Sequence, residues 1–416
     1  MTQENIKLDI DFVRSQFPAF KDPLSKDWSF FENAGGSYVP SNVIDKLTKF
    51  MTSTKVQPYA EYPMSKIAGN NMDKATKYFS QMINAQENEI LVGGSTSINL
   101  YVLSNALKFI IKPGDEIIVT NQDHEANISP WRRLSERGAK IIEWKFDKNS
   151  HELEISELKK LINNKTKILA VTHCSNIIGS INNLKEISEI AHKFNTLVIG
   201  DGVSFAPHGF PDVKELGVDF YTFSLYKTYG PHLALLYGKE EILKKLPNQN
   251  HEFLNGKYPY TINPGGPNHE ELASLIGIYD YFKNLYFHHF NDKDSSILEK
   301  IKKINKLISD HEEIIANPIL DYLNKSKHFN LIGKNKIINK DRAPTISFTS
   351  NKMSSRELSD ILVKNNIATR NDNFYAWRCL QSLGIDTIDG VVRISIVHYN
   401  SKNDVDKLID VLKKIN

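Results

Sequence analysis

The stretch Phe220-Tyr221-Thr222-Phe223-Ser224-Leu225-Tyr226-Lys227-Thr228-Tyr229-Gly230-Pro231 decides how this chain folds. Its apolar and aromatic first half predicts a buried strand, and Lys227 follows that strand closely. Upstream, Asn195-Thr196-Leu197-Val198-Ile199-Gly200 predicts a second strand, which Asp201 follows directly. Because ligands of open α/β sheets bind at the carboxyl ends of the strands, we expect the lysine and the acid to face one site.

This lysine and acid are the pair that pyridoxal phosphate needs. The amine holds the cofactor's aldehyde as a Schiff base, and the carboxylate keeps the pyridine nitrogen protonated so that the ring can act as an electron sink. A lysine is nucleophilic only as the neutral amine, which burial or nearby cations favour. Taken alone, residues such as Lys227 and Asp201 are more often a surface lysine and a helix-capping aspartate.

Three further predicted strands end in polar side chains. The segment 89–100 indicates a strand, a glycine turn and a helix start at Ser95 and Thr96, where hydroxyls and backbone N–H groups suit a phosphate or simply cap the helix. The strand 116–120 leads to His124, whose imidazole could stack on a flat ring or be solvated. The strand 167–173 leads to Asn176. The succession of these side chains at strand ends predicts a cofactor site more strongly than any one of them.

With these motifs the chain resembles the class V aminotransferase family of fold-type I pyridoxal phosphate enzymes, especially its cysteine desulfurase-like branch. The resemblance runs from Phe30-Phe31-Glu32-Asn33-Ala34-Gly35-Gly36 to Arg393 and is most specific in 123–131 and 175–179. It implies an α/β fold with a mostly parallel central sheet and a smaller α+β C-terminal domain. It also implies the following roles: Lys227 as the Schiff-base lysine, Asp201 as the pyridinium partner, His124 stacked on the ring, Asn176 at the 3-oxygen side, Ser95, Thr96, Ser224 and Tyr226 at the phosphate, and Arg393, helped by Arg370, at the substrate carboxylate.

The chain departs from the desulfurase pattern at several of these positions. Ser204 stands where desulfurases usually have glutamine, and it is expected beside the cofactor. Tyr226 replaces the usual histidine before the lysine, as in the kynureninase pattern. The phosphate-binding threonine expected from a neighbouring subunit falls at Gly266, so backbone N–H groups or Asn268 would have to replace it.

The loop that carries the persulfide cysteine differs most. That cysteine should follow the arginine corresponding to Arg370 by five residues, and Tyr375 stands there. Cys379 lies four residues further on, in a stretch that looks helical, and we expect a packed thiol there rather than a displaced nucleophile. The usual persulfide chemistry, which needs a thiolate, is therefore not expected.

Composition narrows the remaining possibilities. The 416 residues are 40% hydrophobic and 24% charged, as in ordinary globular proteins, and the net charge of +3 is too small to indicate nucleic acid or an anionic membrane as a partner. Two cysteines imply no disulfide framework, and no histidine or cysteine spacing indicates a metal site. Met1–Asp9 has no apolar signal-peptide core, and no apolar stretch is long enough to span a bilayer, so we expect a cytoplasmic protein.

The order of predicted elements suggests two domains. Residues 20–270 alternate strands and helices, as in a large cofactor-binding domain. Residues 271–416 begin with a helical tract from about 270 to 323, continue with strands near 345, 367 and 391, and form a small domain that residues 1–19 join. The family resemblance further implies a homodimer with the active site at its interface, for which the aromatic segment 59–64 is a candidate surface.

The sequence thus predicts a pyridoxal phosphate enzyme that acts on a small amino acid, as an aminotransferase or a Cβ lyase. One alternative is a true cysteine desulfurase that uses Cys379. The other is a non-catalytic cofactor-binding protein. Such a protein would be free to lose Lys227 or Arg393, and both residues are present here.

Overall fold

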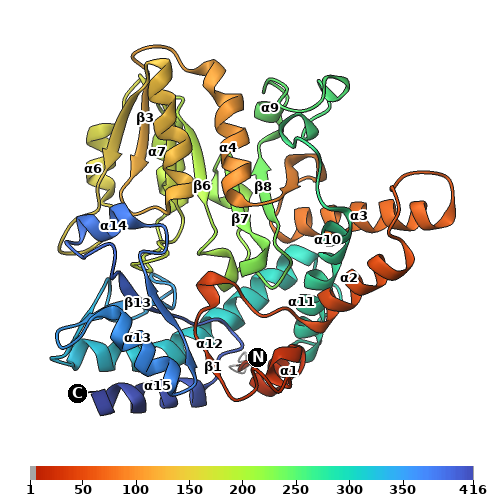
Figure 1. The fold of residues 1–416 in the computed structure, drawn as a ribbon. Coiled ribbons are helices and arrows are strands. Elements are labelled where there is room, and N and C mark those ends of the chain that lie inside the picture. The colour runs from red at the N-terminus through yellow and green to blue at the C-terminus, as the bar shows by residue number, and fades with distance from the viewer. Residues whose placement is uncertain (1–5, 416) are drawn as a thin grey trace.

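A seven-stranded sheet forms the centre of the computed structural model, which describes residues 6–415 (Figure 1). Its strand order is β2-β8-β7-β6-β5-β3-β4. The strands are β2 (Ile90–Gly93), β8 (Ala234–Gly238), β7 (Phe220–Ser224), β6 (Leu197–Asp201), β5 (Thr166–Thr172), β3 (Glu116–Thr120) and β4 (Lys140–Trp144). β8 runs antiparallel to β2 and β7, and the other neighbours are parallel. The mostly parallel sheet is therefore confirmed.

Both faces of this sheet are covered. Within β3, Ile118 packs into one hydrophobic cluster, whereas Ile117 and Val119 pack into another on the opposite face. Period-two alternation between two buried faces is what a sheet covered by helices on both sides requires. The helices and helical turns that follow its strands are α4 (Thr96–Leu107), α5 (Ser129–Arg132), α6 (Ile155–Leu161), α7 (Leu184–His192), α8 (Val213–Leu216) and α9 (Glu240–Leu243).

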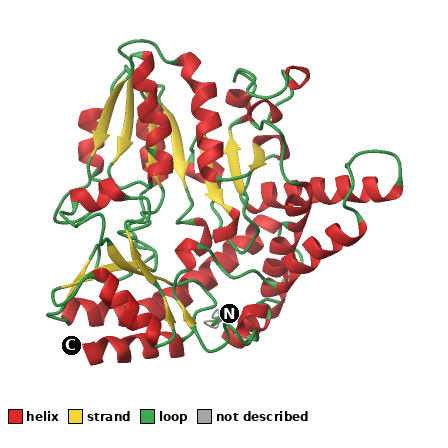
Figure 2. Cartoon of the chain, viewed as in Figure 1, coloured by secondary structure: helices red, strands yellow, loops and turns green. Residues whose placement is uncertain are grey.

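A smaller α+β layer lies beside the lower end of the sheet in Figure 2, and it contains the C-terminal strands. Its antiparallel sheet has the order β12-β13-β10-β9, and a parallel pair joins β1 to β11. These strands are β9 (Phe329–Leu331), β10 (Thr345–Ser350), β12 (Arg370–Asp372), β13 (Val391–Ser395), β1 (Ser29–Phe30) and β11 (Ile367–Ala368). The helices are α12 (Ile297–Lys325), α13 (Ser355–Lys364), α14 (Trp377–Ser382) and α15 (Lys402–Ile415).

The predicted helical tract from about 270 to 323 consists of three helices: α10 (His269–Ser274), α11 (Ile276–His289) and α12. The break before α12 has a local cause, because Ser296 and Glu299 form a capping box that starts a new helix. α10 and α11 pack on α2 (Ser41–Ser53) and α3 (Pro63–Met82). One hydrophobic cluster therefore runs across residue 270, and the division into domains at that point stays a prediction.

Helix α1 (Ile10–Ser15), in the N-terminal segment, contacts residues near the C-terminal end of the chain. Arg14 forms an ion pair with Asp404 at 3.0 Å and donates a hydrogen bond to Ser401 Oγ at 3.3 Å. The predicted junction at residues 1–19 is described only from residue 6, and residues 1–5 lie outside the described part.

Candidate active site

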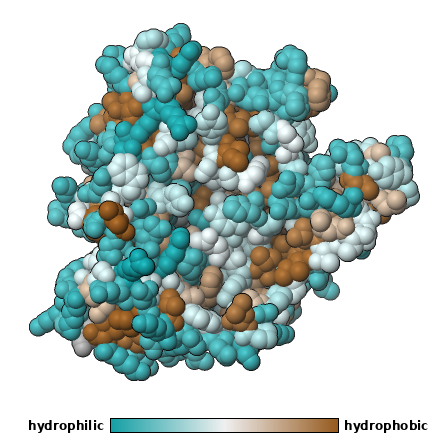
Figure 3. All heavy atoms as spheres, in the orientation of Figure 1, coloured by the Kyte–Doolittle hydropathy of each residue, from teal (hydrophilic) through white to brown (hydrophobic). Residues whose placement is uncertain are grey.

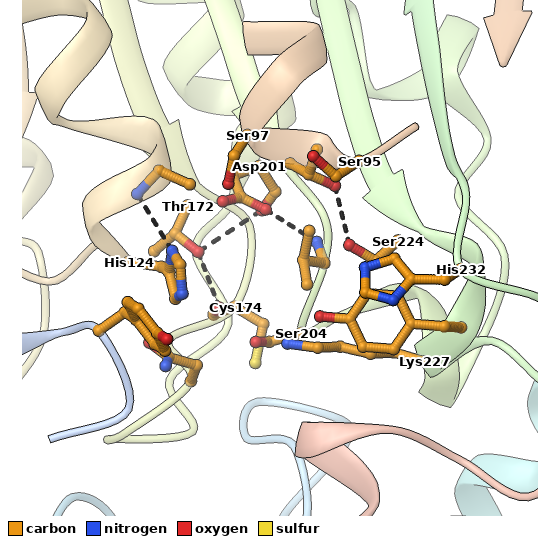
Figure 4. Close-up of a pocket in the computed structure, with 16 residues that line it drawn as sticks. Ser95, Ser97, His124, Thr172, Cys174, Asp201, Ser204, Ser224, Lys227 and His232 are labelled. Atoms are coloured by element: carbon orange, nitrogen blue, oxygen red, sulfur yellow. Dashed lines mark hydrogen bonds between the residues drawn. The ribbon is translucent and has the colours of Figure 1, made fainter. Parts of the chain in front are cut away.

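A cavity of about 350 Å³ opens at the carboxyl ends of the central strands (Figure 4). Parallel strands place their carboxyl ends at one edge of the sheet, where helix N-termini also converge. The cavity is lined by Ser95, Thr96, Ser97, His124, Ala126, Thr172, Cys174, Asn176, Asp201, Val203, Ser204, Ser224, Tyr226, Lys227, His232 and Tyr375. It therefore brings together all of the residues predicted to hold the cofactor.

Lys227 and Asp201 meet in this cavity from neighbouring strands. Asp201 is the last residue of β6 and is almost fully buried, and Lys227 lies in the helical turn after β7. Desolvation and the nearby Arg393 lower the pKa of Lys227 to about 8, although Asp201 and Glu32 oppose this shift. Desolvation raises the pKa of Asp201 to about 6, against a hydrogen bond from the Val203 N–H at 2.9 Å. Lys227 is thus much closer to its neutral, nucleophilic form near neutral pH than an ordinary lysine.

His124 is held as a neutral imidazole at the side of the cavity. Desolvation, together with Lys227 and Arg393, lowers its pKa to about 3. Its Nδ1 accepts a hydrogen bond from the Ala126 N–H at 3.1 Å, which fixes the ring. A neutral, oriented ring of this kind can stack on a flat heterocycle.

Behind His124, the side chain of Asp123 is fully buried. It accepts hydrogen bonds from Thr120 Oγ1 and from Asn127 Nδ2, the latter at 2.6 Å. Desolvation still raises the pKa of Asp123 to about 8. Asp123 therefore orders the turn that presents His124.

Hydroxyl groups gather at the other end of the cavity. Ser95 caps α4, with Oγ accepting from the Ile98 N–H at 3.2 Å, and Thr96 Oγ1 lies 2.9 Å from Ser224 Oγ. α4 sits close to β2 because Gly93 has no side chain: a Cβ there would lie 2.0 Å from Asn99 Oδ1. Tyr226 completes this end, and its ring packs against His232 with centroids 4.4 Å apart. The predicted phosphate residues are thus brought together at a helix N-terminus.

Asn176 carries an unused polar atom at the cavity. Its Nδ2 donates to the Phe374 carbonyl at 2.9 Å, whereas its buried Oδ1 has no hydrogen-bond partner within residues 6–415. A buried polar atom without a partner is costly unless a ligand satisfies it.

Arg393 lies beside the cavity but is not among its lining residues. The buried guanidinium lies over the Phe374 ring at 3.6 Å, and its Nη1 donates to the Asn176 carbonyl at 3.2 Å. Desolvation lowers its pKa to about 10, which leaves it charged at neutral pH. Its Nη2 lies 3.5 Å from Glu32 Oε1, the same oxygen that Arg370 Nε contacts at 3.2 Å. The two predicted carboxylate-binding arginines therefore share the carboxylate of Glu32. Of the two, Arg370 is half exposed.

Tyr375 stands where the resemblance leads us to expect the persulfide cysteine, and it lines the cavity. Phe374 and Tyr375 both have left-handed backbone, with φ of 50° and 57°. The Tyr375 carbonyl accepts from the Glu125 N–H at 2.7 Å, which ties this loop to the His124 turn. Cys379 lies in α14 with no exposed surface, and burial raises the pKa of its thiol. The packed thiol expected from the sequence is therefore what the structure contains.

Pyridoxal phosphate fits the residues that are present. The cavity has a carboxylate for a ring nitrogen, a neutral imidazole for a ring face, an unsatisfied amide for a ring oxygen, hydroxyls for a phosphate and an amine for an aldehyde. This donor set is the chemistry that the cofactor requires. Within residues 6–415 no cluster of three or more His, Cys, Asp or Glu side chains is placed to hold a metal ion.

Some residues of the site did not emerge from the sequence. Thr172 is the last residue of β5 and Cys174 lies two residues beyond it, so their place at a strand end was a usable signal that they line the cavity. Cys174 is buried, and desolvation raises the pKa of its thiol to about 12. Glu32 and His232 had no such signal, because only the folded chain brings them to the arginines and to Tyr226.

Comparisons with known proteins agree with this geometry. A family model described as Aminotransferase class-V matches residues 29–307 and 295–408. The aminotransferase-like protein FGM3 of Gibberella zeae is 36% identical over 98% of this chain and 98% of its own length. A cysteine desulfurase of Yersinia pseudotuberculosis is 28% identical, with 98% of both chains covered.

A solved structure shows the same fold. The apo cysteine desulfurase from Thermococcus onnurineus NA1 superposes with a TM-score of 0.83 at 23% identity, covering 100% of this chain and 99% of its own. No helix among the described residues combines the length and apolarity needed to cross a membrane. The chain belongs to the class V aminotransferase family and is a pyridoxal phosphate-dependent enzyme related to the cysteine desulfurases.

Proposed function

We propose that this enzyme holds pyridoxal phosphate at Lys227 and acts on a small amino acid, as an aminotransferase or a Cβ lyase. The observation that carries the proposal is the meeting of Lys227 and Asp201 in one cavity, with the pKa of the lysine lowered to about 8. When bound, the cofactor supplies an electron sink for negative charge that develops at the substrate Cα.

The residues of the chain divide the remaining work. Lys227 Nζ would hold the cofactor's aldehyde and, once released, move the proton at the substrate Cα, for which a pKa near neutrality is well matched. Asp201 would keep the ring nitrogen protonated, and His124 would cover one ring face. Ser95, Thr96, Ser204, Ser224 and Tyr226 would surround the cofactor, mostly at its phosphate, and Asn176 would contact the 3-oxygen. Arg393 would bind the substrate α-carboxylate through its planar fork.

Two features argue against persulfide chemistry. Tyr375 occupies the position of the desulfurase cysteine and lines the cavity. Cys379 is fully buried, and its raised pKa disfavours the thiolate that would attack sulfur. The true desulfurase using Cys379 remains the alternative that the experiment below separates.

We also propose a cytoplasmic homodimer. Both cysteines are free within the described chain, which suits a reducing compartment. α2 and α3 leave the body of the molecule as an arm, and Figure 3 shows apolar surface where the arm begins. Large hydrophobic side chains exposed on or beside this arm are Ile44, Met51, Tyr59, Tyr62, Met64 and Ile67. Such a patch is typical of a protein interface.

Mass-spectrometric product analysis of the purified holoenzyme with a panel of amino acids, cysteine included, tests the reaction. A keto acid that keeps the substituent on Cβ establishes transamination, and loss of that substituent establishes a lyase. Alanine and sulfide from cysteine establish the desulfurase alternative. Lys227→Ala is the control, and turnover that survives it would overturn the proposal.

A further inference from the structure

Glu32 contacts the guanidinium of Arg393, the group that we propose binds the substrate carboxylate. Arg393 is engaged on three sides: by the Phe374 ring, by the Asn176 carbonyl and by Glu32. The first two are fixed parts of the wall. Glu32 is the only one of the three that offers a carboxylate, the group that Arg393 is expected to bind in the substrate.

The fold keeps a place for the Glu32 side chain. Glu32 follows β1 and forms a parallel bridge with Ser395, so it lies next to the strand that carries Arg393. A Cβ on Gly35 would lie 2.4 Å from each Glu32 carboxylate oxygen, and only glycine leaves this space open. The Glu32 side chain nevertheless keeps 25% of its surface exposed, so it is not locked into the core.

Arg370 offers Glu32 a second partner. One oxygen, Glu32 Oε1, lies 3.2 Å from Arg370 Nε and 3.5 Å from Arg393 Nη2. Two guanidinium groups thus share one carboxylate, and Arg370 lies closer to it. A second carboxylate on Arg393 would leave Glu32 on Arg370, whose Nη1 also lies 3.8 Å from Asp372 Oδ2.

We propose that Glu32 is an internal surrogate of the substrate carboxylate, which holds Arg393 until the substrate displaces it onto Arg370. Arg370 then acts as a positioning residue that receives Glu32, rather than as a direct ligand of the substrate. This inference rests on the proposed function, because it names what occupies Arg393 before the substrate arrives.

The proposal predicts opposite effects for the two partners of the switch. Glu32→Gln removes the competing charge, so a free α-carboxylate should bind more tightly. Arg370→Ala removes the alternative partner, so Glu32 stays on Arg393 and the carboxylate should bind more weakly. The double variant lacks the Glu32 carboxylate that Arg370 would receive. Loss of Arg370 should therefore no longer change the affinity for a free α-carboxylate. Partly exposed ion pairs of this kind correspond to about twofold to fivefold changes in affinity.

The test is a double-mutant cycle with two probes, L-alanine and L-alaninamide, which lacks the carboxylate. Binding is followed through the absorbance of the cofactor in the wild-type holoenzyme, in Glu32→Gln, in Arg370→Ala and in the double variant. Thermal unfolding of the four proteins reports any general loss of structure. The two-probe design matters because Glu32 also raises the pKa of Lys227, an effect that both probes would feel.

L-alaninamide reports the effect of the changed Lys227 pKa that both probes share. Relative to L-alaninamide, we expect L-alanine to bind more tightly to Glu32→Gln and more weakly to Arg370→Ala, with an Arg370→Ala effect that vanishes in the double variant. Equal weakening by Arg370→Ala in both backgrounds would overturn the inference, because Arg370 would then bind the substrate directly. Equal responses of all four proteins to L-alanine, including no response, would overturn it as well. Failure of the wild type to bind the cofactor at Lys227 would instead refute the proposed function.

Discussion

Tyr375 stacks on His124, with ring centroids 5.4 Å apart and ring planes inclined by 29°. Tyr375, which the resemblance places at the position of the desulfurase cysteine, is therefore packed against the imidazole that we expect over the cofactor. The same loop places Phe374 under Arg393 and its carbonyl on Asn176. Tyr375 is part of the cavity wall, whereas Cys379 is not among the residues that line the cavity.

Replacement of Cys379 should leave catalysis intact. The thiol is fully buried in α14, so Cys379→Ala should cost about 1 kcal/mol of stability through lost packing and should not change kcat. Steady-state kinetics and thermal unfolding measure the two quantities. A variant that remained folded but lost turnover would restore the desulfurase alternative.

The pKa of Lys227 should depend on Arg393. Desolvation lowers this pKa most, and the Arg393 cation adds to the effect because it disfavours a second positive charge nearby. The rate at which the apoenzyme takes up pyridoxal phosphate should rise with pH and level off above about 8, as Lys227 loses its proton.

Arg393→Met should move this midpoint to higher pH, because removing a cation favours protonated lysine. Uptake would then be slower at pH 7 and unchanged at high pH. Arg132→Met, which removes an arginine paired with Glu143 instead, should leave the midpoint in place. An unmoved midpoint in Arg393→Met would show that the guanidinium does not act on Lys227.

Ser224 should contribute to cofactor binding only through the phosphate. Its Oγ lies 2.9 Å from Thr96 Oγ1 at the hydroxyl end of the cavity. Ser224→Ala should weaken pyridoxal phosphate by about tenfold, the effect of one hydrogen bond to a charged group, and leave pyridoxal unaffected. Fluorescence titration of the apoenzyme gives both affinities. Ser188→Ala, a buried serine on α7, is the matched control, and an equal loss for both ligands would rule out the phosphate contact.

Asp201 should matter more for turnover than for holding the cofactor. Asp201→Asn keeps the shape of the side chain but cannot hold a proton on the ring nitrogen. We expect kcat to fall by about a hundredfold or more, as when one preorganised electrostatic contact is removed, with cofactor still bound. A variant with unimpaired turnover and a full complement of cofactor would remove the electron-sink argument.

The exposed arm of α2 and α3 should mediate self-association. Ile67 is 48% exposed on α3, and a charge there would be costly in an apolar interface. Ile67→Lys should shift the mass measured by light scattering from dimer to monomer. Ile388→Lys, at a residue 91% exposed outside the arm, should leave the mass unchanged. A monomeric wild type would refute the dimer.

The sequence could indicate which residues gather at the hydroxyl and Lys227 end of the cavity because local patterns determine their positions. A strand followed by a polar residue, as at Asp201 and His124, needs no long-range information beyond the edge that parallel strands share. The same holds for Ser95, whose place at a helix N-terminus follows from the glycine turn before it. Burial of Cys379 also followed from its local helical context.

The carboxylate end could not be predicted in the same way. Glu32 and Arg393 meet across 361 residues, and nothing in either local pattern announces the other. The resemblance placed both arginines at the substrate carboxylate but gave no sign of Glu32, which the structure shows them sharing. The sequence predicted a helical tract from about 270 to 323 without dividing it into separate helices, and the capping box at Ser296 starts the last of them.

Borohydride reduction of the holoenzyme, followed by peptide mapping, tests the central claim most directly. Reduction makes the link between the cofactor and its lysine permanent, so mass spectrometry can locate the modified residue. We predict that the reduced cofactor is found on the peptide that contains Lys227, and that Lys227→Ala carries none. Cofactor on a different lysine, or none on a protein that still turns over its substrate, would contradict the account.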